Sequence, residues 1–160
     1  MIDLRPDMIT DGVEPTCRLV GAGEELAGKQ GHLYAPGISA QSAGAERIHL
    51  QIVRLPPGNR SNAHKHEGHE TAIHILSGES GMWYGEVLQH HLVARAGDFL
   101  YIPANMPHLP YNPSGAESCV AVIARTDPND QESVVLLPEL ETRQDALIRD
   151  ASGPPAGISR

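Results

Sequence analysis

The middle of the chain alternates aliphatic and polar residues with the two-residue period of half-buried β-strands. In residues 47–55 the two alternating sets are Ile48, Leu50 and Ile52, and His49, Gln51 and Val53. Further short β-rich runs follow at intervals of roughly ten residues, each bounded by Gly or Pro. They cover residues 71–78, 81–87, 98–103, 119–125 and 134–138. This spacing predicts an all-β sandwich or barrel.

The two ends of the chain carry weaker patterns. Residues 17–20 and 31–39 favour strands within a stretch that is rich in Gly, Ala and Ser. One helix is predicted over residues 138–151, where Pro138 fits the first helical position and acidic residues fill the first turn. The chain therefore divides into an N-terminal segment of loops and short strands over 1–46, a β-barrel over 47–137, and a C-terminal helix with a disordered tail over 138–160.

Composition narrows the class of protein. A chain of 160 residues is the size of one domain, and its 16 Gly and 13 Pro fit a fold with many turns. The net charge is −8, which disfavours nucleic-acid binding. No apolar run approaches the roughly 20 residues of a membrane span, and the charged N-terminus lacks a signal peptide's apolar stretch. We therefore expect a cytoplasmic protein that binds neither nucleic acid nor membrane.

Cysteine supplies no evident chemistry. Cys17 and Cys119 are the only two cysteines, and they lie far apart without the spacing of a zinc ribbon or a disulfide framework. Cys119 belongs to the apolar run 119–125, so a buried structural thiol is the preferred interpretation.

The nine histidines are the clearest chemical signal, and four of them fall within residues 64–74. His64 and His66 would share one face of a strand with Cα atoms about 6.6 Å apart, so that both rings could reach one metal ion. Glu70 lies an even number of residues from both His64 and His66, so it would join the same face if the strand continued. His108 follows the strand that is predicted over 98–103. Three imidazoles and a carboxylate suit Fe, Mn, Ni, Cu or Zn rather than Mg or Ca. By itself, an HxH pair is more often a solvated strand face.

The spacing around these residues resembles the two motifs of the cupin superfamily. Gly58, His64, His66, Glu70 and Gly78 follow the first motif, G-x5-H-x-H-x3,4-E-x6-G. The second motif, G-x5-P-x-G-x2-H-x3-N, is followed by Gly97, Pro103, Asn105, His108 and Asn112.

The resemblance implies an antiparallel double-stranded β-helix, a jelly-roll barrel that is often dimeric. It implies one divalent transition metal ion (Fe, Mn, Ni, Co, Cu or Zn) inside the barrel, with His64, His66, Glu70 and His108 as ligands.

Two positions depart from the motifs. Asn105 stands where the second motif has Gly, and we expect it to adopt a positive φ, which Asn tolerates well. Seven residues instead of six separate Glu70 from Gly78. A β-bulge near Glu70 and Thr71 would turn Ile73 and Ile75 inward and His74 outward, whereas a regular strand carrying Glu70 inward would bring His74 into the pocket.

Other residues are candidates for the pocket with weaker support. Arg60 and Asn62 could contact an anionic substrate at the barrel mouth or simply form a solvated turn. The aromatic residues are more often core than substrate platform, although one or two are expected to line the cavity. The full set of candidates is Arg60, Asn62, His74, Trp83, Tyr84, Phe99, Tyr101 and Asn112. His90 and His91 are interpreted as a surface turn, and His69 is not favoured over Glu70 as a ligand.

The leading functional hypothesis is a metalloenzyme acting on a small organic molecule. We favour a dioxygenase-like reaction, that is, O2-dependent oxidation, or other carbonyl or hydroxyl chemistry. An isomerase or lyase with a redox-inert metal is an alternative, as is a non-catalytic cupin that binds metal and a small ligand. The expected partners are a small-molecule substrate and a second copy of the chain in a homodimer.

Overall fold

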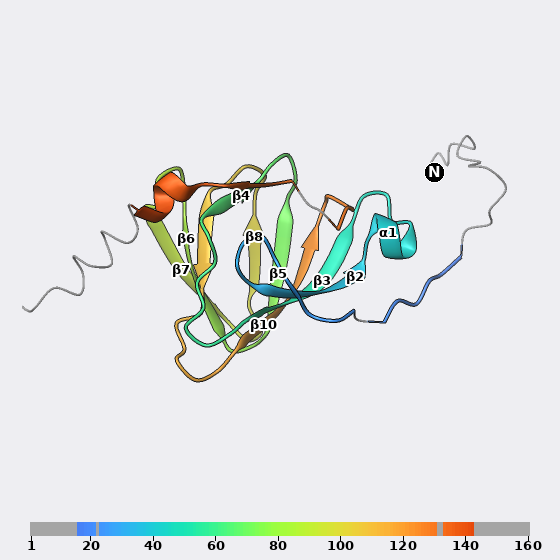
Figure 1. Ribbon diagram of the computed structural model, residues 1–160, viewed down its shortest axis with the longest axis horizontal. Helices are drawn as coiled ribbons and strands as arrows, with labels where there is room; N and C mark the ends of the chain where they lie inside the picture. Colours follow the sequence, from blue (N-terminus) through green and yellow to red (C-terminus); the bar gives the residue numbers. More distant parts are fainter. Residues whose placement is uncertain (1–15, 22, 131–132, 143–160) are drawn as a thin grey trace, which may run out of the picture.

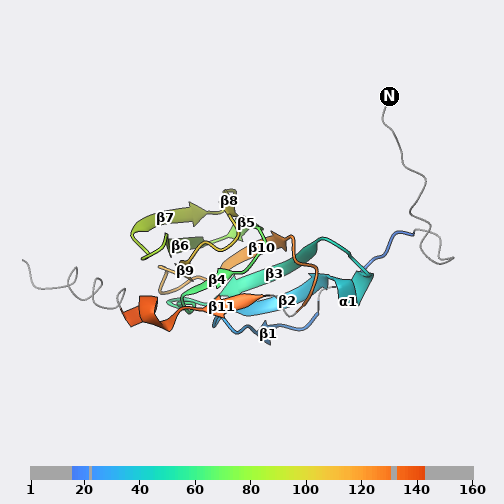
Figure 2. The same ribbon diagram turned by 90° about the horizontal axis from the view of Figure 1, so that it is seen from above.

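The computed structural model describes residues 16–21, 23–130 and 133–142, which form two antiparallel sheets around a barrel (Figures 1 and 2). The six-stranded sheet has the order β1-β2-β3-β10-β5-β8, and the five-stranded sheet has the order β11-β4-β9-β6-β7. The first sheet contains β1 (Leu26–Ala27), β2 (Leu33–Ile38), β3 (His49–Leu55), β5 (Thr71–Ser77), β8 (Phe99–Ile102) and β10 (Cys119–Arg125). The second contains β4 (His64–His66), β6 (Glu79–Tyr84), β7 (His90–Arg95), β9 (His108–Tyr111) and β11 (Val134–Leu136). The chain is therefore a mostly-β jelly roll.

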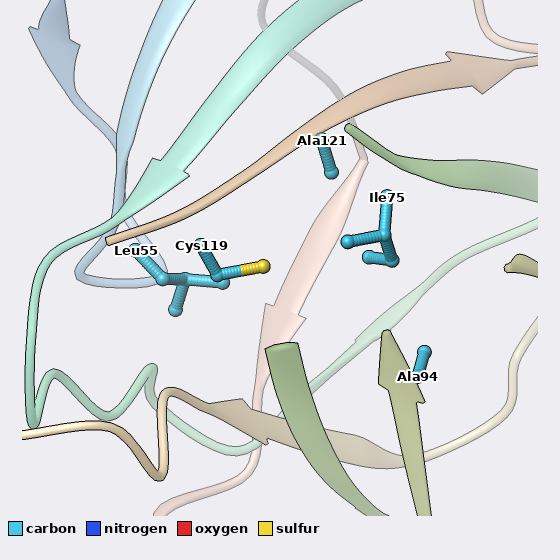
Figure 3. Close-up of a cluster of buried hydrophobic side chains, with 5 residues drawn as sticks. All are labelled: Leu55, Ile75, Ala94, Cys119 and Ala121. Carbon is cyan, nitrogen blue, oxygen red and sulfur yellow. The ribbon is translucent and has the colours of Figure 1, made fainter. Parts of the chain in front are cut away.

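The hydrophobic core lies between the two sheets (Figure 3). It consists of Leu55, Ile75, Ala94, Cys119 and Ala121, which come from four strands, and Ile73 packs against them. Each of these strands sends every second side chain inward, so the core is built from alternate positions. Burying these apolar side chains stabilises the closed barrel.

A second apolar cluster lies on the outer side of the five-stranded sheet. Ala63, Leu88 and Leu109 are buried there, with Trp83, Leu137 and Leu140 packed against them. Residues 138–142 are helical, and Oε1 of Glu141 accepts a hydrogen bond from the Ala63 N–H. In both ribbon views this helical turn and α1 (Ala40–Ala43) lie at opposite ends of the barrel.

Two motif residues make tight turns. Gly78 has φ of 73°, and a Cβ there would lie 2.6 Å from the Ser118 carbonyl oxygen, so only glycine fits. Asn105 has φ of 64°, which confirms the expected positive φ. Its Oδ1 accepts a hydrogen bond from the Gly68 N–H, which joins the turns that carry the two motifs.

Most predicted strands are confirmed, and the differences are local. Residues 17–20 form no strand, and α1 was not predicted. His90 and His91 begin β7 instead of forming a turn, and β9 was also missed. β1 and β2 extend the sheet that contains β3. The predictions for residues 143–160 lie outside the described residues.

Candidate metal centre

Three histidines meet inside the barrel, on the inner side of the five-stranded sheet. His64 and His66 lie on β4, and His108 lies opposite His64 on the neighbouring strand β9. All three are buried, and one ring nitrogen of each lies within 4.8 Å of the others. The ring centroids of His64 and His108 are 4.2 Å apart. The sequence spacing predicted this convergence, because β4 presents alternate residues on one face.

Hydrogen bonds to the backbone fix two of these rings. Nδ1–H of His64 donates to the Asn62 carbonyl at 2.7 Å, and Nδ1–H of His108 donates to the Met106 carbonyl at 2.8 Å. Since a carbonyl can only accept, these contacts leave Nε2 of each neutral ring with its lone pair available to a metal.

Electrostatics favour the neutral form of His64. Burial lowers its pKa well below the ordinary value, and the neighbouring His108 and His66 lower it further, although the bond to Asn62 opposes this. A neutral imidazole is the form that binds a metal. The donor set therefore fits a transition-metal ion.

The structure does not bring Glu70 to the three histidines. Glu70 is exposed, and its Oε1 accepts a hydrogen bond from the Tyr101 hydroxyl at 2.6 Å on the outside of the barrel. Thr71 is buried instead and lines the cavity. Because neighbouring residues of a strand point to opposite faces, Glu70 cannot share the inward face with Thr71. This placement differs from the motif-based expectation.

The predicted bulge near Glu70 is wrong. Strand β5 pairs regularly with β10 from Thr71 to Ile75, and the register shifts only beyond that point, between Val120 and Ala121. The extra residue is therefore accommodated at Leu76. Ile73 and Ile75 line the cavity as expected. His74 faces outward, where its ring stacks on Phe99 at a centroid distance of 4.3 Å.

His69, which was not favoured as a ligand, is a buried neighbour of the three histidines. Its ring centroid lies 5.0 Å from that of His66, and its Nδ1 lies 3.9 Å from Oδ2 of Asp127. Burial raises the pKa of Asp127, but hydrogen bonds from Asn129 and Ser133 outweigh it and lower that pKa overall. Asp127 therefore remains a carboxylate beside His69.

The three histidines line a cavity in which the centre of a water-sized sphere can occupy about 70 Å³. Its wall is mostly aliphatic and includes Val53, Leu55, Ile73, Ile75, Met82 and Ile102. Cys119 also lines it, and burial raises the pKa of its thiol, so the sulfur stays protonated. Such a cavity can hold a small organic molecule beside the histidines.

None of the eight pocket candidates lines this cavity. Trp83 packs in the outer cluster, and Phe99 and Tyr101 are exposed on the outer side of β8. Tyr84 contacts His90, and Arg60 pairs with Tyr111 outside the named strands. For Trp83, Phe99 and Tyr101 these placements follow from strand parity, because they alternate with inward residues such as Met82 and Ile102. Tyr84 has the parity of Met82 and lies opposite His108, yet it does not line the cavity.

Two of the candidates instead have structural contacts. Nδ2 of Asn112 donates to the carbonyls of Leu55, Pro56 and Glu117. Nδ2 of Asn62 donates to the Lys29 carbonyl.

Six polar residues that sequence reasoning missed do line the cavity: Gln30, His32, Gln51, Thr71, Ser80 and Arg125. Gln30 and His32 come from the segment before β2, where the sequence pattern is weak. Gln51 and Arg125 lie on strands that were predicted, but periodicity does not indicate which face of a strand is inside. The presence of His49, Gln51 and Val53 on one side of β3 was the only available signal.

Comparisons with known proteins agree with this architecture. The profile of the Cupin domain family matches residues 51–124. No curated protein matches the sequence. In the described residues, no helix is long and apolar enough to cross a membrane.

Solved structures with the same fold have different activities in their descriptions. The polyketide cyclase RemF from Streptomyces resistomycificus has a TM-score of 0.58 at 22% identity, with 82% of this chain and 94% of that chain covered. The oxalate decarboxylase OxdC from Bacillus subtilis, as a single-residue mutant, has a TM-score of 0.60 at 19% identity. That match covers 86% of this chain and only 38% of the decarboxylase. At these identities the likeness concerns the fold alone. Together, the domain match and the jelly roll show that residues 51–124 of this chain are a cupin domain.

Proposed function

We propose that this chain is a metalloenzyme that binds one divalent transition-metal ion through His64, His66 and His108 and acts on a small organic molecule in the adjoining cavity. The observation that carries the proposal is the convergence of three buried imidazole nitrogens within 4.8 Å at the wall of that cavity. Three neutral nitrogen donors suit Fe, Mn, Co, Ni, Cu or Zn.

O2-dependent oxidation is the reaction that we favour. The three histidines come from one sheet, so they would occupy one side of an ion and leave the side toward the cavity for other ligands. An open site with three protein ligands on one side is typical of non-haem iron oxygenases. The bound ion would supply Lewis acidity and, if redox-active, electron transfer to O2.

The chain's own groups complete the site. The backbone carbonyls of Asn62 and Met106 hold two of the rings in the orientation that binding needs. The aliphatic wall positions the substrate and excludes water from it. The protonated Cys119 thiol does not compete for the ion as a thiolate.

The same proposal includes a cytoplasmic homodimer formed through the outer side of the six-stranded sheet. The apolar outer face consists of Leu50, Ile52, Ala72, Leu76, Phe99, Tyr101 and Val122. Phe99, the chain's single phenylalanine, is 82% exposed there. Two charged side chains adjoin this face: Glu70 is bonded to Tyr101, and Arg54 follows Leu50 and Ile52 on the same side of β3.

Metal content and O2 reactivity test the enzyme proposal. We expect the purified protein to contain close to one transition-metal ion per chain. His64→Ala and His108→Ala should lose the ion yet keep their β-type circular dichroism, because the apolar core is separate from the histidines. Lys65→Ala is the matched control, since Lys65 lies between the two β4 histidines with the opposite parity.

Loading with Fe(II) without O2 then separates the reaction classes. Nitric oxide should give a high-spin paramagnetic signal if open coordination positions exist, and O2 uptake should depend on a substrate. O2-independent turnover with Zn or Mn would favour an isomerase or lyase. A site that is closed to nitric oxide would favour a non-catalytic binding protein, and failure to take up any of these metals would contradict the proposal.

A further inference from the structure

Two polar side chains from the six-stranded sheet face the cavity without a partner in the protein. Gln51 is 6% exposed, and its amide forms no hydrogen bond with any described residue. Thr71 is 2% exposed, and its Oγ1 is buried without a hydrogen-bond partner. Both residues line the cavity that contains the three histidines. A buried polar group normally has a partner, because leaving one unsatisfied is costly, so these two groups point to a bound molecule.

The register of the six-stranded sheet sets the spacing between these two groups. Gln51 on β3 pairs with Ile123 on β10, which pairs in turn with Ile73 on β5. Thr71 precedes Ile73 by two residues on β5, so the two share the inward face. Two strand spacings across the sheet and two residues along it would separate the Cα atoms of Gln51 and Thr71 by about 12 Å in a flat sheet. At that spacing the two side chains would contact different ends of a small molecule that lies across β10.

The wall between the two groups includes aliphatic side chains. Ile73 and Ile123 lie between Gln51 and Thr71 in the sheet, and both line the cavity. Arg125 also faces this region, but it donates a hydrogen bond to the Asn129 carbonyl, so we assign it no role in selecting the ligand. A molecule that reaches both polar groups would therefore place its middle part against isoleucine side chains.

We propose that the substrate is a small molecule with an apolar middle and two uncharged polar groups, one bound by the Gln51 amide and the other by the Thr71 hydroxyl. This inference rests on the proposed function, which locates the substrate in this cavity. The Gln51 amide presents a donor and an acceptor side by side, which an amide group of the substrate would match. The Thr71 hydroxyl can donate one hydrogen bond and accept others, which suits a hydroxyl group.

Uncharged groups fit these two positions better than ionised ones. Neither Gln51 nor Thr71 carries a charge, so neither could neutralise an ionised group that leaves water for a mostly aliphatic cavity. A molecule with a single polar group would leave one of the two side chains unsatisfied. The two positions therefore favour a hydroxyamide over an alcohol, an amide or a hydroxy acid of similar shape.

Calorimetric titration of the full chain, before and after treatment with a chelator, tests this inference. The main probe is trans-4-hydroxycyclohexanecarboxamide, whose two polar groups lie at opposite ends of an apolar ring. Cyclohexanecarboxamide and cyclohexanol each lack one of the groups, and trans-4-hydroxycyclohexanecarboxylate replaces the amide with a charge. The acid is compared after chelation, because a carboxylate could bind a metal ion directly. We expect the hydroxyamide to bind about tenfold or more tightly than each of the other three.

One variant at each position assigns the two contacts. Thr71→Val should weaken binding of the hydroxyamide and of cyclohexanol by about tenfold and leave cyclohexanecarboxamide unchanged. Gln51→Leu should weaken binding of the hydroxyamide and of cyclohexanecarboxamide by about tenfold and leave cyclohexanol unchanged. Thr126→Val and Gln89→Leu are the matched controls, since they change exposed residues of the same types outside the cavity wall.

Stability and metal content keep the result interpretable. Both cavity variants should unfold at the same or a higher urea concentration than the wild type, because each removes a buried polar group that has no partner in the protein. A clear loss of stability would assign the two groups to the fold and overturn the inference. A hydroxyamide that binds no more tightly than the other probes, or that binds both variants as well as the wild type, would overturn it even if the metal is present. The expected binding pattern in a chain that takes up no metal would instead overturn the proposed metalloenzyme and leave this binding site standing.

Discussion

At the scale of single residues, a shift of one position along a strand decides which side chains reach the site, because successive residues point to opposite faces. His64 and His66 share a face with each other, and Thr71 shares the interior with Ile73 and Ile75. Glu70 precedes Thr71 by one residue and therefore lies outside, bonded to Tyr101. Motif spacing predicted a carboxylate at the metal, but the regular ladder of β5 gives that inward position to Thr71.

Glu70→Gln tests this placement through both metal content and tyrosine titration. Metal occupancy should stay near the wild-type value, because Glu70 lies outside the barrel. The hydrogen bond and negative charge of Glu70 raise the pKa of Tyr101, so the substitution should lower that pKa toward its ordinary value. Absorbance at alkaline pH, with Tyr101→Phe to identify the signal, measures the change. A sharp loss of metal in Glu70→Gln would restore the motif-based ligand set.

At the scale of elements, the ends of strands are joined by a few buried polar side chains. Asn112 follows β9, and its amide bonds to carbonyls at the end of β3 and in the turn before β10. Its Oδ1 accepts from the Ser114 N–H. One residue thus connects the end of β9 with the end of β3 and with the turn before β10.

Asn112→Ala should therefore destabilise the fold substantially. It leaves three carbonyls and one N–H without their partner, and we expect a loss of about 2–4 kcal/mol in the free energy of unfolding. Urea denaturation monitored by circular dichroism measures it. Asn59→Ala is a useful control on the neighbouring loop, because its backbone N–H and carbonyl form its bonds there. Equal stability of Asn112→Ala and the wild type would contradict this account.

At the scale of the whole molecule, the apolar outer face exposes hydrophobic surface that a monomer would leave in water. Its five largest exposed side chains offer on the order of 500 Å², a patch size that marks an interaction site. A standard interface buries about 800 Å² on each partner, with polar residues at its rim. The face is therefore large enough to form the centre of a dimer interface.

Light scattering coupled to size exclusion tests the dimer. We expect a particle with twice the 17.2 kDa mass of the chain. Phe99→Asp should shift it toward the monomer, because a charge would be buried at the centre of the interface. Leu19→Asp changes a fully exposed leucine outside this face and should leave the dimer intact. A monomeric wild type would refute the proposal.

The sequence by itself determined the class of fold and three members of the site. Alternation, turn residues and the two motifs were sufficient to predict an all-β barrel in which His64, His66 and His108 converge, since these features depend on local spacing. The positive φ of Asn105 was predictable for the same reason.

Only the tertiary structure decided which face of each strand is inside. In β3 the more aliphatic set, with Leu50 and Ile52, lies outside, whereas Gln51 and Val53 line the cavity. A period of two defines two faces, but the partner sheet and the neighbouring segments determine which face is enclosed. Gln30 and His32 reach the cavity from just before β2, where the sequence pattern is too weak to indicate a face. The histidines were therefore readable from spacing, whereas the wall that would face them required the packing of both sheets.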